Sequence, residues 1–187
     1  MVLAKYTGEN LNIRHTVDDE PLQDSFFLHA HRTYELFYFI SGDCYYTVEG
    51  TDYPLVSGCF LLMRSGEAHT LHVRSAETYE RITVNFSPSV IPLLGKEVGE
   101  LFCERPLGKG NLFIPDEESG SFLNLCMQKI CREATDGGNE ERMISNLMPV
   151  LTELYHIRST STDENSYLTP PSQGSSETVS KIIEYIN

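Results

Sequence analysis

Short apolar stretches, separated by polar residues and glycine turns, dominate the chain from residue 26 to residue 86. Enrichment in Tyr, Phe, Val, Ile and Thr predicts strands near 26–31, 34–40, 44–48, 52–55, 59–63, 70–74 and 78–86. Glycines that accept positive φ mark the turns between them, as in Ser41-Gly42-Asp43 and Ser57-Gly58. Seven or so short strands at such close spacing predict a small sandwich or barrel.

The stretch 34–40 is apolar on both faces except at Glu35. A strand covered on both sides is central to its sheet, so we expect the barrel interior on one face and a further layer on the other. A carboxylate buried there needs a compensating partner, such as a metal, a histidine or a ligand. Residues 1–25 are polar and rich in turns, and they predict one short strand near 12–16 with loop around it.

The pattern changes after residue 86. Ser87-Pro88-Ser89 resembles a helix start, with Pro88 at the first helical position. We expect one short helix to end near Leu94 and another to run over 96–102. A loop at 104–111 and a last edge strand at 112–115 complete the first predicted unit, residues 1–115.

Residues 116–158 predict a pair of helices. In the first, a repeat at spacings of three and four residues involves Phe122, Leu125, Cys126, Lys129 and Ile130, and the helix ends in the cluster 135–139. The second has a cleaner stripe over three turns, made by Ile144, Leu147, Met148, Leu151, Leu154 and Tyr155. The short connection predicts antiparallel packing. The second stripe suits either a dimer interface or a cover for the barrel.

The end of the sequence differs in composition. Residues 159–178 have almost nothing to bury and read as a linker. Residues 179–187 turn helical and apolar again, and an isolated helix of that length is unstable in water. We therefore expect a chain cut at the start of a further helical domain.

Composition narrows the functional classes. The formal charge of −13, from 14 basic and 27 acidic residues, disfavours tight binding to nucleic acid by this chain itself. Its apolar runs are far too short to span a bilayer, and the N-terminus lacks the apolar core of a signal peptide. Five scattered cysteines without a CxxC pair suit reduced thiols and a cytoplasmic location.

The candidate chemistry lies around the predicted central strand. His29, His31 and Glu35 stand at odd positions, so in extended geometry their side chains share one face. His69 follows downstream. Imidazole and carboxylate groups at a common point suit one divalent transition metal such as Zn, Ni, Fe or Mn, with positions open for a ligand. The alternative is a set of polar groups that hydrogen-bond to one another and to the barrel backbone.

Two spaced patterns resemble the cupin motifs. The first, HxHxxxE and six residues to a glycine, fits at His29, His31, Glu35 and Gly42. The second retains Gly58, Gly66 and His69 but has Arg64 in place of the usual Pro and Val73 where Asn is common. The resemblance implies a mainly β fold with C-terminal α: a cupin, which is a small double-stranded β-helix or jelly-roll barrel, followed by the helix pair. Arg64 is expected at the rim, where it would be within reach of an anionic effector.

The order of the parts, from the cupin through a helix pair and a polar linker to the segment 179–187, resembles AraC-type transcriptional regulators. The resemblance implies an effector-sensing, homodimeric domain without enzymatic activity, which contacts DNA only through an absent helix-turn-helix domain. It favours the 144–155 stripe as the dimer interface. For the small-molecule effector we expect a pocket formed by His29, His31, Glu35, Phe37, Tyr46 and His69, although aromatic residues such as Phe37 and Tyr46 more often form core.

Two other functions stay open at this point. A metal-dependent cupin enzyme, such as a dioxygenase or a sugar-phosphate isomerase, would use the same four ligands with the metal as a Lewis acid or oxygen-binding centre. A cupin that serves only as a dimerisation scaffold would bind no ligand.

Overall fold

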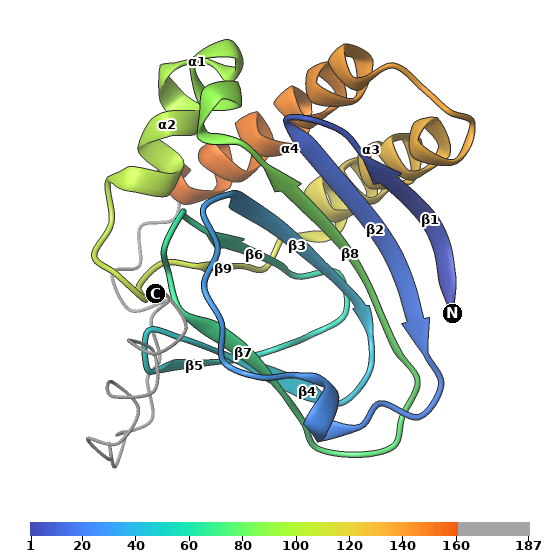
Figure 1. Ribbon diagram of the computed structural model, residues 1–187. Helices are drawn as coiled ribbons and strands as arrows, with labels where there is room; N and C mark the ends of the chain where they lie inside the picture. Colours follow the sequence, from blue (N-terminus) through green and yellow to red (C-terminus); the bar gives the residue numbers. More distant parts are fainter. Residues whose placement is uncertain (161–187) are drawn as a thin grey trace.

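A computed structural model describes residues 1–160, and within them the strands form two antiparallel sheets (Figure 1). The large sheet has the order β1 (Val2–Thr7), β2 (Leu11–Asp18), β8 (Tyr79–Phe86), β3 (Tyr34–Ser41), β6 (Phe60–Met63) and β9 (Leu112–Phe113). The small sheet has the order β5 (Thr51–Pro54), β4 (Cys44–Val48) and β7 (His69–Val73). The predicted mainly β fold with C-terminal helices is confirmed.

Strand β3 lies in the middle of the large sheet, between β8 and β6. Its alternate residues face opposite ways, as strand geometry requires. Phe37 and Phe39 enter the apolar core between the two sheets, whereas Leu36 and Tyr38 belong to a second core on the outer face. The prediction of a central strand covered on both sides is therefore confirmed. At its end, Gly42 takes φ 129° where a Cβ would approach the Cα of Tyr79 to 3.3 Å, so only glycine fits this turn.

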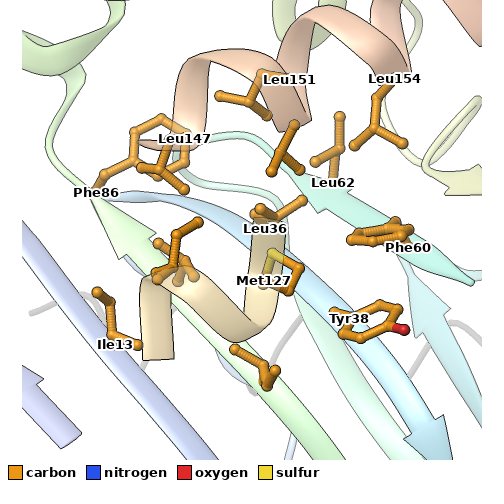
Figure 2. Close-up of a cluster of buried hydrophobic side chains, with 14 of the residues drawn as sticks. Ile13, Leu36, Tyr38, Phe60, Leu62, Phe86, Met127, Leu147, Leu151 and Leu154 are labelled. Carbon is orange, nitrogen blue, oxygen red and sulfur yellow. The ribbon is translucent and has the colours of Figure 1, made fainter. Parts of the chain in front are cut away.

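The helices α3 (Glu117–Thr135) and α4 (Glu140–Thr160) seal the outer face of the large sheet (Figure 2). Asp116 caps α3 by accepting a hydrogen bond from the amide of Ser119 at 2.8 Å. On the sheet, the buried partners include Ile13, Leu36 and Phe86. This outer core holds the helix pair on the barrel.

The apolar stripe of α4 covers the barrel. Leu147, Leu151 and Leu154, which the sequence placed in a dimer interface, are fully buried within the chain against the large sheet (Figure 2). Ile144 and Tyr155 are partly buried at the edge of this core, and Met148 keeps 41% of its surface exposed. A second copy of the chain would meet surface residues and not the three leucines.

The stripe expected on α3 is displaced. Only Ile130 of the predicted residues is buried on its core face, which is formed by Leu123, Met127, Ile130, Cys131 and Ala134. Phe122 and Leu125 point away from the core, with 44% and 65% of their surfaces exposed. The helix carries apolar residues on two sides, so periodicity alone did not identify the side that faces the sheet.

The short helices follow the prediction closely. Ser87 accepts a hydrogen bond from the amide of Ser89 at the start of a 3-10 turn over Pro88–Val90, which leads into α1 (Ile91–Leu94). A second helix, α2 (Lys96–Cys103), packs beside α4 (Figure 1). The predicted edge strand near residue 112 is β9.

Two predictions at the N-terminal side were wrong. Residues 1–25 contain β1 and β2 in place of one short strand within loop, because each strand buries residues on one face only and their polar partners mask the alternation. Residues 26–31 form no strand. Gln23, from a 3-10 turn over Gln23–Ser25, accepts from the amide of Val73 and donates to the carbonyl of Leu71, occupying the β7 edge that a strand would need.

Helix α4 includes Ser159 and Thr160, which the sequence assigned to the linker. The rest of that linker and the predicted helix over 179–187 lie outside the described residues. Within residues 1–160, no helix has the length and apolar character needed to cross a membrane.

Candidate functional site

The four candidate polar side chains meet at the mouth of the barrel, between the two sheets. His69 belongs to β7, and His29 pairs with it through two backbone hydrogen bonds of 3.1 and 2.9 Å although the surrounding segment is irregular. Glu35 comes from β3, and His31 lies in the turn that leads into that strand. The sequence predicted that His29, His31 and Glu35 share one face. The structure brings the three side chains together, although of these residues only Glu35 lies in a strand.

The three imidazole rings share one hydrogen-bonding pattern. Each donates its Nδ1–H to a main-chain carbonyl two residues away: His29 to Phe27 at 2.9 Å, His31 to Thr33 at 2.9 Å and His69 to Glu67 at 2.8 Å. A carbonyl oxygen can only accept, so each Nδ1 carries a proton, and in a neutral ring the lone pair is then on Nε2. Nε2 of His31 lies 2.8 Å from Oε2 of the Glu35 carboxylate, which also only accepts, so this ring carries a second proton that a metal ion would displace. One ligand atom from each ring lies within 4.8 Å of the others. This tautomer and orientation are those of histidines that bind metal ions.

The clearest indication that the cluster binds a metal ion or ligand comes from His69. Its ring is fully buried, and Nε2 has no hydrogen-bond partner among the described residues. Burial lowers the pKa of His69, although the nearby carboxylate of Glu35 partly opposes this. A buried, neutral imidazole with a free lone pair fits a metal ion or a hydrogen-bond donor from a ligand.

Glu35 completes the cluster as a buried carboxylate. Its Oε2 lies 2.8 Å from Nε2 of His31 and 3.8 Å from Nε2 of His69, and it accepts a hydrogen bond from Asn85 at 2.9 Å. Burial opposes its ionisation, but the His31 hydrogen bond and the neighbouring histidines outweigh that effect and lower the pKa of Glu35. The same contact outweighs burial for His31 and raises its pKa. Glu35 is therefore an anionic ligand atom beside three imidazoles.

A cavity of about 490 Å³ opens at this cluster. Phe37 and Tyr46, which the sequence proposed for ligand binding, form part of its apolar wall, with ring centroids 5.0 Å apart. The other wall is polar and comes from β2 and β8, with residues the sequence analysis missed: Asn12, Arg14, Thr16, Arg81, Thr83 and Asn85. Alternation along 79–86 places Arg81, Thr83 and Asn85 on one face, which is the signal that could have found them.

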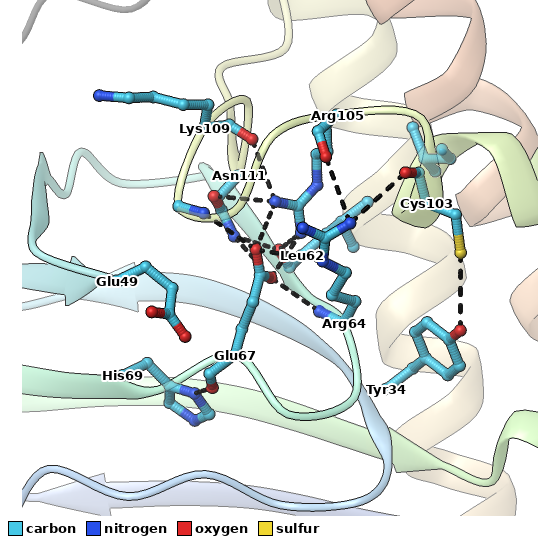
Figure 3. A network of polar contacts seen from close by, with 12 residues as sticks. Tyr34, Glu49, Leu62, Arg64, Glu67, His69, Cys103, Arg105, Lys109 and Asn111 are labelled. Carbon is cyan, nitrogen blue, oxygen red and sulfur yellow. Dashed lines mark hydrogen bonds and ion pairs between the residues drawn. The ribbon is translucent and has the colours of Figure 1, made fainter. Parts of the chain in front are cut away.

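Behind the cluster, a buried ion pair holds the turn that carries His69 (Figure 3). Glu67 accepts two hydrogen bonds from the guanidinium of Arg105, at 2.7 and 2.6 Å, and another from Asn111 at 3.2 Å. Burial opposes ionisation of Glu67, but Arg105 prevails and lowers the pKa of the carboxyl group. The same Glu67 residue offers the carbonyl that orients His69. We refer to Glu67, Arg105 and Asn111 as the buried clasp.

Arg64 also belongs to this region. Its guanidinium donates to the carbonyls of Cys103 and Arg105, at 3.4 and 3.2 Å (Figure 3). The arginine in the usual proline position therefore ties the turn after β6 to the end of α2, and its side chain does not line the cavity. Contact between Arg64 and an anionic effector stays a prediction.

Comparison with known proteins agrees with this architecture. A family model described as the AraC-like ligand binding domain matches residues 16–150. No curated protein matches the chain. Similar solved structures include an RmlC-like cupin family protein from Methanocaldococcus jannaschii, which is 17% identical with a TM-score of 0.41 and covers 46% of this chain and 79% of its own.

Two further solved structures give the range of similar proteins. A cupin superfamily protein from Desulfitobacterium hafniense is 10% identical, with a TM-score of 0.40 over 46% of this chain and 76% of that protein. A DMSP lyase from Ruegeria pomeroyi is 16% identical, with a TM-score of 0.37 over 43% of this chain and 40% of that protein.

Proposed function

The chain belongs to the family of AraC-like ligand-binding domains, and we propose that it is the effector-sensing and dimerisation domain of a DNA-binding transcriptional regulator. The observation that carries the proposal is the cavity at the barrel mouth, lined by His29, His31 and Glu35 and bounded by aromatic residues. Concave sites with a few convergent polar groups are the usual form of small-molecule sites. A DNA-binding domain joined to this one would supply the contacts with DNA.

The donor set at the cavity fits one divalent transition metal. His29, His31 and His69 would bind it through Nε2, with Glu35 as the carboxylate ligand. Imidazole and carboxylate together suit Zn, Ni, Fe or Mn. When bound, the ion would supply a Lewis-acidic point for an oxygen atom of the effector.

Coupling to the rest of the regulator would run through the buried clasp. Arg105 follows Glu104, whose carbonyl accepts from Arg158 in the last turn of α4 at 2.6 Å. Arg158 also donates to the carbonyl of Leu101 in α2 at 3.0 Å. A ligand that shifts His69 and Glu67 would therefore act on the end of α4, as a population shift between two arrangements of clasp and helix.

Calorimetric titration with Zn²⁺ tests the site. We expect a single ion per chain in the wild type and a loss of affinity in His31→Ala that exceeds the roughly 10–100-fold cost of removing an outer-shell partner. His72→Ala is the matched control, because His72 lies on the same strand as His69 but stacks on Tyr45, outside the cavity. Equal affinity in His31→Ala and wild type would remove the metal from the proposal.

The regulatory part of the proposal is tested separately. The codons that follow residue 187 in the gene should encode two basic helix-turn-helix units. Their absence would contradict the assignment to a regulator while leaving the cavity and its metal site intact.

A metal-dependent enzyme is the second candidate, and the cluster of three histidines with Glu35 favours it. Such an enzyme would turn over a dioxygenase or sugar-phosphate isomerase substrate with the metal as Lewis acid. Assays of the metal-loaded protein with substrates of both enzyme classes distinguish an enzyme from a sensor. Turnover that disappears in His31→Ala would replace the sensor by the enzyme, whereas binding without turnover agrees with a sensor.

A further inference from the structure

The charged groups that line the cavity differ in whether another side chain of the described residues pairs with them. Glu35 is paired with His31 at 2.8 Å, and Arg81 is bound to Asp18 and lies over the ring of Tyr79 at 4.4 Å. The third charged group is Arg14, whose guanidinium makes no hydrogen bond or ion pair within the part of the chain that the structure describes. Arg14 therefore leaves the cavity wall with one uncompensated positive charge.

The neighbours of Arg14 sharpen this observation. On the same face of the sheet, Asn12 and Thr16 flank it along β2, and Thr83 stands directly opposite on β8. On the other side, Lys5 of β1 stands directly opposite. Two like charges in directly opposed positions destabilise a sheet, and no carboxylate stands in any of these adjacent positions.

Arg14 is exposed, and the chain that carries it has 27 acidic and only 14 basic residues. With that excess of carboxylates, a solvated surface arginine would commonly have an acidic neighbour. Here the neighbours are neutral or basic, and a neutral hydroxyl and amides line the wall beside it. Such groups are donors suited to an oxyanion.

We propose that the effector is a small organic molecule with a carboxylate or phosphate group, and that Arg14 binds this oxyanion at the end of the cavity opposite the histidine cluster. Arg14 and Glu35 lie two strands apart in the large sheet, which corresponds to about 10 Å across the strands. A molecule of metabolite size spans that distance, with its carbon skeleton against Phe37 and Tyr46. The inference rests on the proposed function, because it names the effector class for the same cavity.

The test uses simple oxyanions as probes. The full chain, freed of metal on a chelating resin, is titrated with sodium acetate and with inorganic phosphate at about pH 8, above the ordinary histidine pKa. Backbone NMR signals of Asn12, Thr83 and Asn85 report on the cavity, and sodium chloride at equal ionic strength corrects for screening. We expect saturable shifts with at least one probe, and the tighter probe identifies the oxyanion as carboxylate or phosphate.

Variants of Arg14 distinguish a specific oxyanion site from non-specific electrostatic attraction. Arg14→Gln should weaken binding about tenfold or more, the loss expected for a charge-assisted hydrogen bond, whereas Arg14→Lys should retain a large part of it. Arg132→Gln removes the same charge from the exposed side of α3 and should leave the affinity unchanged. Shifts no larger than those with chloride, or equal affinity in Arg14→Gln and wild type, would overturn the proposal. Neither result depends on DNA binding, so the regulator assignment succeeds or fails separately.

Discussion

The two faces of the large sheet are built from the same strands but differ in their surroundings: the helices cover one face, and the other lines the cavity. On β8, Ile82, Val84 and Phe86 are buried under the helices, whereas Arg81 and Asn85 alternate with them and face the cavity. The outer face is continuous with the core that fixes the helix pair. The inner face leaves polar and charged groups only partly covered, because the small sheet has three strands and the large sheet has six. Core residues and cavity residues thereby alternate along one strand.

The largest expected effect comes from breaking the buried clasp. Arg105→Ala leaves the carboxylate of Glu67 buried without its partner, so the free energy of unfolding should fall by about 3–5 kcal/mol. Urea unfolding measures this. The double replacement Glu67→Leu with Arg105→Met is the control, because removing both charges together costs far less. Equal stability of Arg105→Ala and wild type would contradict a stabilising role of the buried clasp.

A second change acts on the outer face alone. Leu151→Ala creates a cavity under α4 and should lower the free energy of unfolding by about 2–5 kcal/mol. Met148→Ala, on the exposed side of the same helix, should cost far less. Zn²⁺ affinity of the folded Leu151→Ala protein should remain that of the wild type, and a parallel loss of affinity would show that the two faces are not separate.

The inner face should respond in the converse way. Asn85→Ala removes the hydrogen bond to Glu35, so Zn²⁺ affinity should fall by roughly 10–100-fold, as for other partners of metal ligands. The free energy of unfolding should change by only about 1 kcal/mol. Thr83→Val is the control on the same face of β8. A large loss of stability with unchanged affinity would assign Asn85 to the core and not to the site.

Much of this separation was visible in the sequence. The strands from residue 34 to residue 86 were predicted closely, because glycine turns delimit them and their apolar residues are buried. The convergence of His29, His31 and Glu35 followed from the two-residue period. By contrast, β1 was missed because Ala4 is its only buried residue.

The remaining parts of the site depend on long-range pairing that one sequence does not display. Arg14 meets the cavity only because β2 pairs with β8 about 70 residues away, in a register that strand patterns do not fix. Glu67 and Arg105 are likewise joined only by the fold. The α4 stripe was predicted as a dimer interface or as a cover for the barrel, and its buried leucines pack on the large sheet. An apolar arc by itself does not reveal whether a sheet or a second subunit packs on it.

The smallest effect concerns dimerisation, which stays a prediction. The exposed Phe122 and Leu125, one turn apart on α3, are available to a second copy. Leu125→Glu should shift the sedimentation profile toward the monomer without changing unfolding or Zn²⁺ affinity. Leu93→Glu, at an exposed leucine of α1, is the control. Unaltered sedimentation of Leu125→Glu would place the dimer contact elsewhere.

The most direct test of the inner face as a binding site is an anomalous difference map from crystals of the whole chain grown with Zn²⁺. We expect a peak about 2.0–2.1 Å from Nε2 of His29, His31 and His69, with Glu35 as a further ligand. A map with no peak at that point, or with peaks only at histidines outside the cavity such as His72, would contradict this expectation.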